Sequence, residues 1–227
     1  MQSTRAKAPI GILMLDTNFP RFLGDIGNRA SFDFPVLYKT VTAASPELAV
    51  LHDPKPMLDA FIEAGQDLIK EGVKGISTSC GFLSLFQDEL SEALAVPVLT
   101  SALIDVARVQ AALPDGQKVG ILTISASSLS ARHLRAASVP DGTPIGSTEC
   151  GGEFTKAILS NRNTLDMELA RQDNVNAAIS LVQTEQKIGA LMLECTNMGP
   201  YAGDIAKATG LPVHSIVTVL TRFQKDL

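Results

Sequence analysis

The chain has 227 residues, of which 45% are apolar and 19% are charged, so it is long and apolar enough to bury a core as one large domain or two smaller lobes. Its net charge of −5 comes without a run of lysines or arginines, which argues against a nucleic-acid or anionic-membrane surface. Three widely spaced cysteines do not form a disulfide framework and fit reduced thiols in the cytoplasm. No stretch approaches roughly eighteen uninterrupted apolar residues, so we predict no membrane span and expect a small molecule or another protein as the partner.

The first half of the chain alternates apolar runs with amphipathic ones. Residues 10–15 are continuously apolar, as in a strand buried on both faces, and the run ends at Asp16. A loop over 20–33 and a second strand within 34–41 follow, and then a helix over 54–71. This helix leads into a third apolar run, 73–78, which ends just before Cys80.

The remaining elements continue the alternation to the end of the chain. The pattern predicts helices over 83–95, 101–113, 128–137, 166–184, 201–208 and 215–223, and strands over 96–99, 118–125, 189–194 and 211–213. Strands that alternate with helices indicate parallel sheets with helices on both faces, which is an α/β fold.

A near-repeat divides the chain into two similar halves. At an offset of 115 residues Cys195 falls on Cys80, and each cysteine follows an apolar run and precedes a helical segment. The runs 10–15 and 118–125 share a Gly-Ile-Leu triplet at a similar offset. We therefore predict two α/β lobes, the first from 1–100 plus 213–227 and the second from 101–212.

The two cysteines are the candidate catalytic residues. A thiol between a strand and a helix lies near free backbone N–H groups, which lower a thiol pKa and also bind carboxylates. Facing each other across a cleft, Cys80 and Cys195 could remove and return a proton on opposite faces of a carbon next to a carboxylate, as a cofactor-free racemase requires. The alternative is that both are ordinary core cysteines. Core packing alone does not explain why both lie at matched positions beside small polar residues.

Three segments carry a resemblance to a known family: Ser79-Cys80-Gly81, Glu194-Cys195-Thr196-Asn197-Met198 and the opening segment 15–21. They resemble the aspartate/glutamate racemase superfamily, which includes hydantoin and allantoin racemases, maleate isomerase and arylmalonate decarboxylase. The resemblance implies two pseudo-twofold related α/β lobes with the active site between them, one catalytic cysteine from each lobe, no cofactor and frequent homodimers. It predicts an amino-acid racemase or epimerase, an isomerase that uses Cys80 and Cys195.

The sequence departs from the glutamate racemases beside both cysteines. Those enzymes carry asparagine and threonine after the first cysteine, where this chain has Gly81 and Phe82, and a histidine where Asn197 stands. The departures argue against strict glutamate specificity, and Phe82 indicates a less polar or differently shaped substrate pocket. A maleate-type isomerase, a decarboxylase of a small dicarboxylate and a non-catalytic binding protein for small acids remain alternatives.

Seven residues are candidates for substrate binding. They lie beside the cysteines or at the ends of the opening strands: Asp16, Ser79, Gly81, Phe82, Ser125, Thr196 and Asn197. Asp16 could orient Cys80, bind a substrate amine or serve as a turn cap. Cys150 lacks the strand-to-helix context, and Glu153 is a weaker acid-base candidate. The three histidines have no metal-ligand spacing and no nucleotide-binding glycine motif follows a strand, so we predict neither a metal nor a cofactor.

Overall fold

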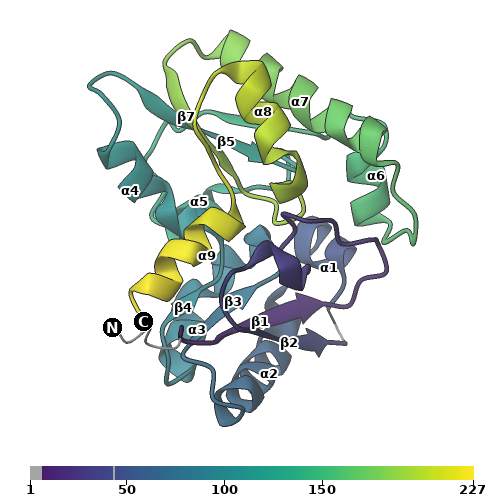
Figure 1. Ribbon diagram of the computed structural model, residues 1–227, viewed down its shortest axis with the longest axis vertical. Coiled ribbons are helices and arrows are strands. Elements are labelled where there is room, and N and C mark those ends of the chain that lie inside the picture. The colour runs from purple at the N-terminus through teal and green to yellow at the C-terminus, as the bar shows by residue number, and fades with distance from the viewer. Residues whose placement is uncertain (1–6, 43) are drawn as a thin grey trace, which may run out of the picture.

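The computed structural model describes residues 7–42 and 44–227 and contains two parallel four-stranded sheets, one in each lobe (Figure 1). The first sheet has the order β2-β1-β3-β4 and the second has the order β6-β5-β7-β8. Their bounds are β1 Ile10–Leu15, β2 Val36–Val41, β3 Gly75–Thr78, β4 Val98–Leu99, β5 Lys118–Thr123, β6 Ile145–Ser147, β7 Ile188–Leu193 and β8 Val213–His214. Each lobe thus repeats one topology, and the predicted α/β fold with two similar lobes is confirmed.

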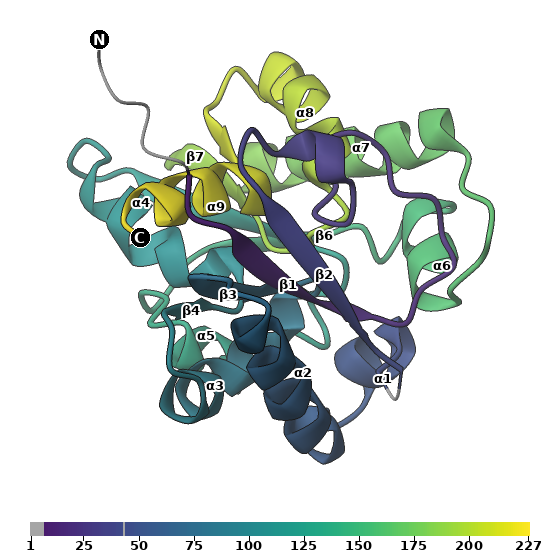
Figure 2. The ribbon, with the colours of Figure 1, turned by 60° about the horizontal axis from the view of Figure 1, so that its bottom comes forward.

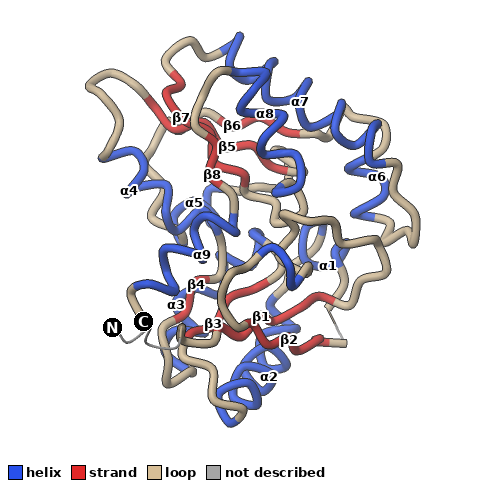
Figure 3. Tube along the Cα trace, in the orientation of Figure 1, coloured by secondary structure: helices blue, strands red, loops and turns tan. Residues whose placement is uncertain are grey.

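Helices cover the faces of both sheets, as Figures 2 and 3 show. The α-helices are α1 Pro46–Leu51, α2 Leu58–Lys70, α3 Gln87–Ala93, α4 Val106–Ala111, α5 Ala131–Ala136, α6 Phe154–Leu159, α7 Met167–Thr184, α8 Ala202–Thr209 and α9 Ile216–Lys225. Short 3-10 helices span Arg29–Ser31, Lys55–Met57, Gly81–Phe86, Ala102–Asp105 and Gly199–Tyr201. In the first lobe α2 packs on β1 and β2, and in the second lobe α7 packs on β5 and β6. The central strands β1, β5 and β7 are almost entirely buried, which explains their continuous apolar runs.

The order of the strands places both cysteines at equivalent points of the fold. In each sheet the chain leaves the first strand toward one side and returns to the other, so the direction of winding changes between β1 and β3 and between β5 and β7. Ligands of open parallel sheets bind beyond the carboxyl ends of strands at such a point. Cys80 follows β3 there, and Cys195 follows β7.

The last strand and helix link the two lobes. β8 pairs with β7, with Val213 opposite Leu191 and His214 opposite Met192. The second sheet therefore continues to His214, two residues past the predicted lobe end at 212. Helix α9 then returns to the first lobe, where Phe223 lies against Gly75 at the start of β3. The division into the residue ranges 1–100 plus 213–227 and 101–212 stays a prediction.

Several helices differ from the sequence-based expectation. The helix expected over 83–95 is a 3-10 helix, Gly81–Phe86, followed by the short α3, and the tighter winding leaves five of the six residues of the 3-10 helix buried. Helices α1 and α6 were not predicted, since six residues are too few to establish a periodic pattern. In the described part of the chain, no helix combines the length and apolar composition needed to cross a membrane.

Candidate active site

Both cysteines line one pocket between the lobes. The pocket contains about 320 Å³ of space not filled by atoms, a volume that includes space open to solvent. Its lining residues are Leu15, Phe19, Pro46, Val50, Cys80, Gly81, Phe82, Ile124, Ile158, Glu194, Cys195, Thr196 and Asn197. Most of these side chains are apolar, so the polar groups in the wall are concentrated in the two cysteine segments.

Cys80 lies in extended backbone directly before the 3-10 helix Gly81–Phe86. Burial and the nearby Glu194 carboxylate raise the pKa of the Cys80 thiol to about 12, although the backbone N–H groups of Phe82 and Leu83 act in the opposite direction. The sequence-based expectation of a lowered thiol pKa is therefore wrong for Cys80. The N–H groups are present as expected, but the desolvation of a fully buried thiolate outweighs them.

Cys195 is held by a hydrogen bond within its own segment. Its Sγ donates to Asn197 Oδ1 at 3.7 Å. Burial and the Glu194 carboxylate raise the pKa of the Cys195 thiol well above its ordinary value. Cys195 is therefore a protonated donor.

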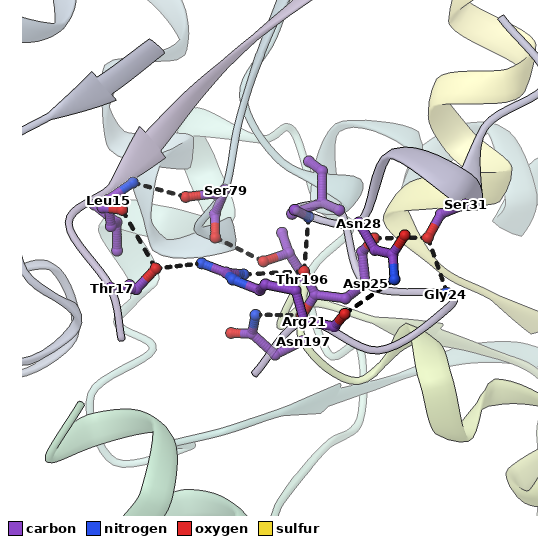
Figure 4. A network of polar contacts seen from close by, with 12 residues as sticks. Leu15, Thr17, Arg21, Gly24, Asp25, Asn28, Ser31, Ser79, Thr196 and Asn197 are labelled. Atoms are coloured by element: carbon purple, nitrogen blue, oxygen red, sulfur yellow. Dashed lines mark hydrogen bonds and ion pairs between the residues drawn. The ribbon is translucent and has the colours of Figure 1, made fainter. Parts of the chain in front are cut away.

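A network from the first lobe fixes the orientation of Asn197 (Figure 4). Asn197 Nδ2 donates to Asp25 Oδ2 at 2.8 Å, and Arg21 donates to Asp25 Oδ1 at 3.0 Å. Arg21 also donates to Thr17 Oγ1 at 2.7 Å, and its guanidinium lies 4.4 Å above the ring of Phe19. Because an ionised carboxylate only accepts hydrogen bonds, the NH₂ group of Asn197 must face Asp25 and its oxygen must face the Cys195 thiol.

The loop that carries Asp25 reaches across to the second lobe. Gly24 has φ +99°, and a Cβ there would lie 2.8 Å from the Pro200 backbone nitrogen and 2.9 Å from the Gly199 carbonyl carbon. A side chain would therefore be strained and would also clash. A second contact between the lobes joins Thr196, which donates its hydroxyl to the Ser79 carbonyl at 2.6 Å.

Among the described residues that line the pocket, Glu194 alone has an ionisable carboxyl group, and it is fully buried. Thr123 Oγ1 donates to Glu194 Oε2 at 2.7 Å, while Oε1 has no hydrogen-bond partner among the described residues. Burial raises the pKa of Glu194 to about 7, against the smaller opposing effect of the Thr123 hydrogen bond. The carboxyl group lies against Gly81, where a Cβ would be 2.8 Å from Glu194 Cδ.

The structure brings together six of the nine predicted site residues in the pocket wall: Cys80, Gly81, Phe82, Cys195, Thr196 and Asn197. The other three are engaged elsewhere. Asp16 is exposed, and its backbone carbonyl accepts from Asn161 Nδ2 at 3.3 Å. Ser79 Oγ accepts from the Leu15 N–H at 2.9 Å, which ties the segment before Cys80 to β1.

Ser125 belongs to a separate carboxylate cluster in the second lobe. Its hydroxyl donates to Glu149 Oε1 at 2.7 Å, and the N–H of Ala126 donates to Glu149 Oε2 at 2.9 Å. Burial on its own would raise the pKa of Glu149, but the hydroxyls of Ser127 and Ser125 outweigh it and lower the pKa to about 2. The protein's own carboxylate thus occupies Ser125, which was expected to bind the substrate.

Two further candidates, Cys150 and Glu153, do not line the pocket. Cys150 is exposed. Glu153 forms an ion pair with Arg162 at 2.6 Å, away from the pocket. Among the described residues, no group of three histidine, cysteine, aspartate or glutamate side chains could hold a metal ion.

Sequence reasoning missed Arg21, Asp25, Thr123 and Glu194 as site residues. Glu194 carried a usable signal, since it is an acidic residue that ends the apolar run 188–193 and lies beside a candidate cysteine. Asp25 carried none, because it lies in a loop without periodicity and reaches Asn197 across 172 positions in sequence.

Comparison with solved structures shows which fold this is. Unliganded arylmalonate decarboxylase aligns with a TM-score of 0.65 at 15% identity, over 97% of this chain and 92% of that one. Glutamate racemase from Francisella tularensis in complex with D-glutamate aligns with a TM-score of 0.61 at 16% identity, over 97% of this chain and 80% of that one. Allantoin racemase from Pseudomonas fluorescens aligns with a TM-score of 0.60 at 14% identity, over 96% of this chain and 90% of that one.

The chain has the fold of arylmalonate decarboxylase, glutamate racemase and allantoin racemase. No protein-family model matches the sequence. The resemblance deduced from the cysteine segments is confirmed at the level of the fold.

The curated relatives have a different activity from the one predicted. A dimethylsulfoniopropionate lyase from Durusdinium sp. clade D is 28% identical over 226 residues, which are 92% of this chain and 72% of that protein. Dimethylsulfoniopropionate lyase 6 from Emiliania huxleyi is 28% identical over 218 residues, 92% of this chain but 57% of its own length. The predictions of an amino-acid racemase and of the isomerase class are therefore wrong, since these relatives are lyases. The cysteine motifs mark the fold and do not distinguish between the reactions it supports.

Proposed function

We propose that this protein is a lyase that cleaves dimethylsulfoniopropionate into dimethyl sulfide and acrylate. The observation that carries the proposal is the pair of buried thiols in one largely apolar pocket, in a chain whose curated relatives are dimethylsulfoniopropionate lyases. The pocket is small, as a substrate with a three-carbon acid and two methyl groups requires.

The reaction is a β-elimination that needs one base. The thiolate of Cys80 removes a proton from the carbon next to the substrate carboxylate. The electron pair of that C–H bond becomes the new carbon–carbon double bond, and the bond from the β-carbon to the sulfonium sulfur breaks. The sulfur keeps the pair of that bond and leaves as neutral dimethyl sulfide, so acrylate and a protonated Cys80 remain.

The surroundings of the two thiols support Cys80 as the base. The N–H groups of Phe82 and Leu83 stabilise the Cys80 thiolate. Cys195 already donates its one hydrogen bond to Asn197, whose orientation Asp25 fixes, and so is held as a thiol. In this assignment Cys195 stays protonated beside the substrate and does not act as a base.

Four of the predicted substrate-binding residues remain part of the proposal. Gly81, Phe82, Thr196 and Asn197 line the pocket and so can contact the substrate. We retain the expectations of a homodimer and of a cytoplasmic location. Size-exclusion chromatography with light scattering tests the first, since a monomer mass would contradict it.

Headspace gas chromatography of the purified protein with dimethylsulfoniopropionate tests the activity, with acrylate followed by proton NMR. We expect both products in equal amounts with the wild type and neither with the Cys80→Ser/Cys195→Ser double variant. The exposed Cys150→Ser variant is the matched control and should keep full activity. Product formation by the wild type at the rate of the double variant would refute the proposed function.

A further inference from the structure

Glu194 is a buried carboxyl group to which neither the reaction above nor the fold gives a role. It lies in the pocket wall, where Thr123 satisfies only Oε2. Glu194 Oε1 is buried without a hydrogen-bond partner, and no ion pair to Glu194 occurs among the residues that the structure describes. An isolated buried carboxylate is costly, so this arrangement calls for a partner that enters with the ligand.

The rest of the pocket wall limits the chemistry of that partner. A primary ammonium group brings three N–H donors, which the apolar side chains of Leu15, Ile124 and Ile158 cannot satisfy. A methylated onium group has no such donors and is surrounded by methyl groups. It matches a wall in which apolar side chains surround a single free carboxyl oxygen.

Neighbouring residues keep the Glu194 carboxyl group in place. Thr123 on β5 fixes Oε2, and the absence of a side chain at Gly81 leaves room for the carboxyl beside Cys80. Arg21, on the loop that carries Asp25, already donates to Asp25 and Thr17. The carboxyl group is therefore held in place in the pocket wall, and its Oε1, which lies against Gly81, has no hydrogen-bond partner among the described residues.

We propose that Glu194 binds the positively charged onium group of the substrate and so selects methylated sulfonium acids over ordinary amino acids. This inference rests on the proposed function, because that function supplies the sulfonium. Binding of the onium group to Glu194 also affects the ionisation of Cys80. The Glu194 carboxylate disfavours ionisation of both thiols, and a cation beside Glu194 offsets that effect, so substrate binding promotes formation of the Cys80 thiolate.

Two unreactive acids of the same shape test the proposal by isothermal titration calorimetry. They are 4-(trimethylammonio)butanoate, which carries a fixed positive charge but has no leaving group on its β-carbon, and 5,5-dimethylhexanoate, its neutral carbon counterpart. We expect the wild type to bind the cation at least about tenfold more tightly than the neutral acid. In Glu194→Gln the affinity for the cation alone should fall, so that the two affinities differ by no more than about threefold. Glu63→Gln, at an exposed position on α2, removes one negative charge outside the pocket and should leave the preference intact.

Three outcomes would overturn the proposal. The first is equal binding of the two acids by the wild type, which needs no variant. The second is an unchanged preference for the cation in Glu194→Gln. The third is an equal loss of affinity for both acids in that variant, which is the result expected of a purely structural residue. If Glu194→Gln does not fold, Glu194→Met takes its place, since an apolar side chain of similar length removes the buried charge. Because neither acid reacts, these results are separate from the dimethyl sulfide assay, whose failure would refute the proposed function instead.

Discussion

Asn197 Nδ2 lies 2.8 Å from Asp25 Oδ2, and this hydrogen bond links the long loop of the first lobe to the cysteine segment of the second. Asp25 is only 2% exposed, and it also accepts hydrogen bonds from Arg21 and from the Gly27 N–H. A buried carboxylate with three donors resists reorientation. Asp25 is thus a positioning residue that acts on Cys195 through the Asn197 amide.

The Asp25→Asn variant tests this positioning role. It leaves Arg21 without its ionic partner and lets the Asn197 amide turn, so we expect a loss of about 3 kcal/mol in the free energy of unfolding. The rate of elimination should fall while the wild-type KM is largely kept, because the variant disturbs Cys195 rather than the apolar wall. Urea unfolding and steady-state kinetics measure the two effects. Asp33→Asn, which breaks the exposed ion pair with Lys7, should change neither, and equal effects of the two variants would count against the role.

The two cysteines should respond unequally to substitution by serine. Cys80→Ser replaces the base with a hydroxyl that does not ionise, so we expect the elimination rate to fall by about 10³-fold or more. Cys195→Ser keeps a donor for Asn197 Oδ1 and should cost only about tenfold. Initial rates of dimethyl sulfide release by both variants provide the measurement. The opposite order of the two losses would make Cys195 the base.

Gly81 should tolerate no side chain, in contrast to a glycine at the surface. A Cβ at Gly81 would clash with the carboxyl group and the main-chain carbonyl of Glu194, so Gly81→Ala should destabilise the fold by about 2 kcal/mol and displace Glu194. Gly203→Ala in helix α8 has no atom within 4 Å of the new Cβ and should stabilise by up to about 1 kcal/mol. Thermal unfolding measures both changes. A neutral Gly81→Ala would mean that the Glu194 carboxyl is not held against this loop.

The sequence predicted the fold well because its strongest signals are local. The apolar runs of β1, β5 and β7 and the cap of α7 at Asp166 are readable without any tertiary contact. The repeat around Cys80 and Cys195 then predicted two lobes, and both cysteines do line one pocket. The reaction was mispredicted because a thiol beside an acidic carbon can serve racemisation or elimination, and the leaving group lies in the substrate.

The parts of the site that sequence reasoning missed depend on burial or on contacts between distant segments. The raised pKa of Cys80 follows from desolvation, which the residues beside it do not reveal. Ser125 is occupied by Glu149, which lies 24 positions further along the chain, and no local pattern marks that pairing. Asp25 joins the site only through the folded path of its loop.

Glu194 and Glu149 should affect the pH dependence of stability in opposite directions. Burial raises the pKa of Glu194 to about 7 from its ordinary 4.5, so its favourable contribution is complete below 4.5 and is lost as the pH rises through 7. The thiols of Cys80 and Cys195 stay protonated throughout this range, because burial raises their pKa values further. Glu194→Gln should therefore gain stability over the wild type between pH 4.5 and 8.5, by about 3 kcal/mol at the upper end.

Glu149 provides the matched comparison. Its pKa is lowered to about 2, so the carboxylate stabilises the fold above pH 4.5 and this contribution is lost as the pH falls toward 2. Glu149→Gln should be less stable than the wild type at pH 7, and the difference should shrink toward pH 3. Urea unfolding of the wild type and both variants across pH 3 to 8.5 measures the two slopes. Parallel curves for Glu194→Gln and the wild type would show that folding does not raise the pKa of Glu194.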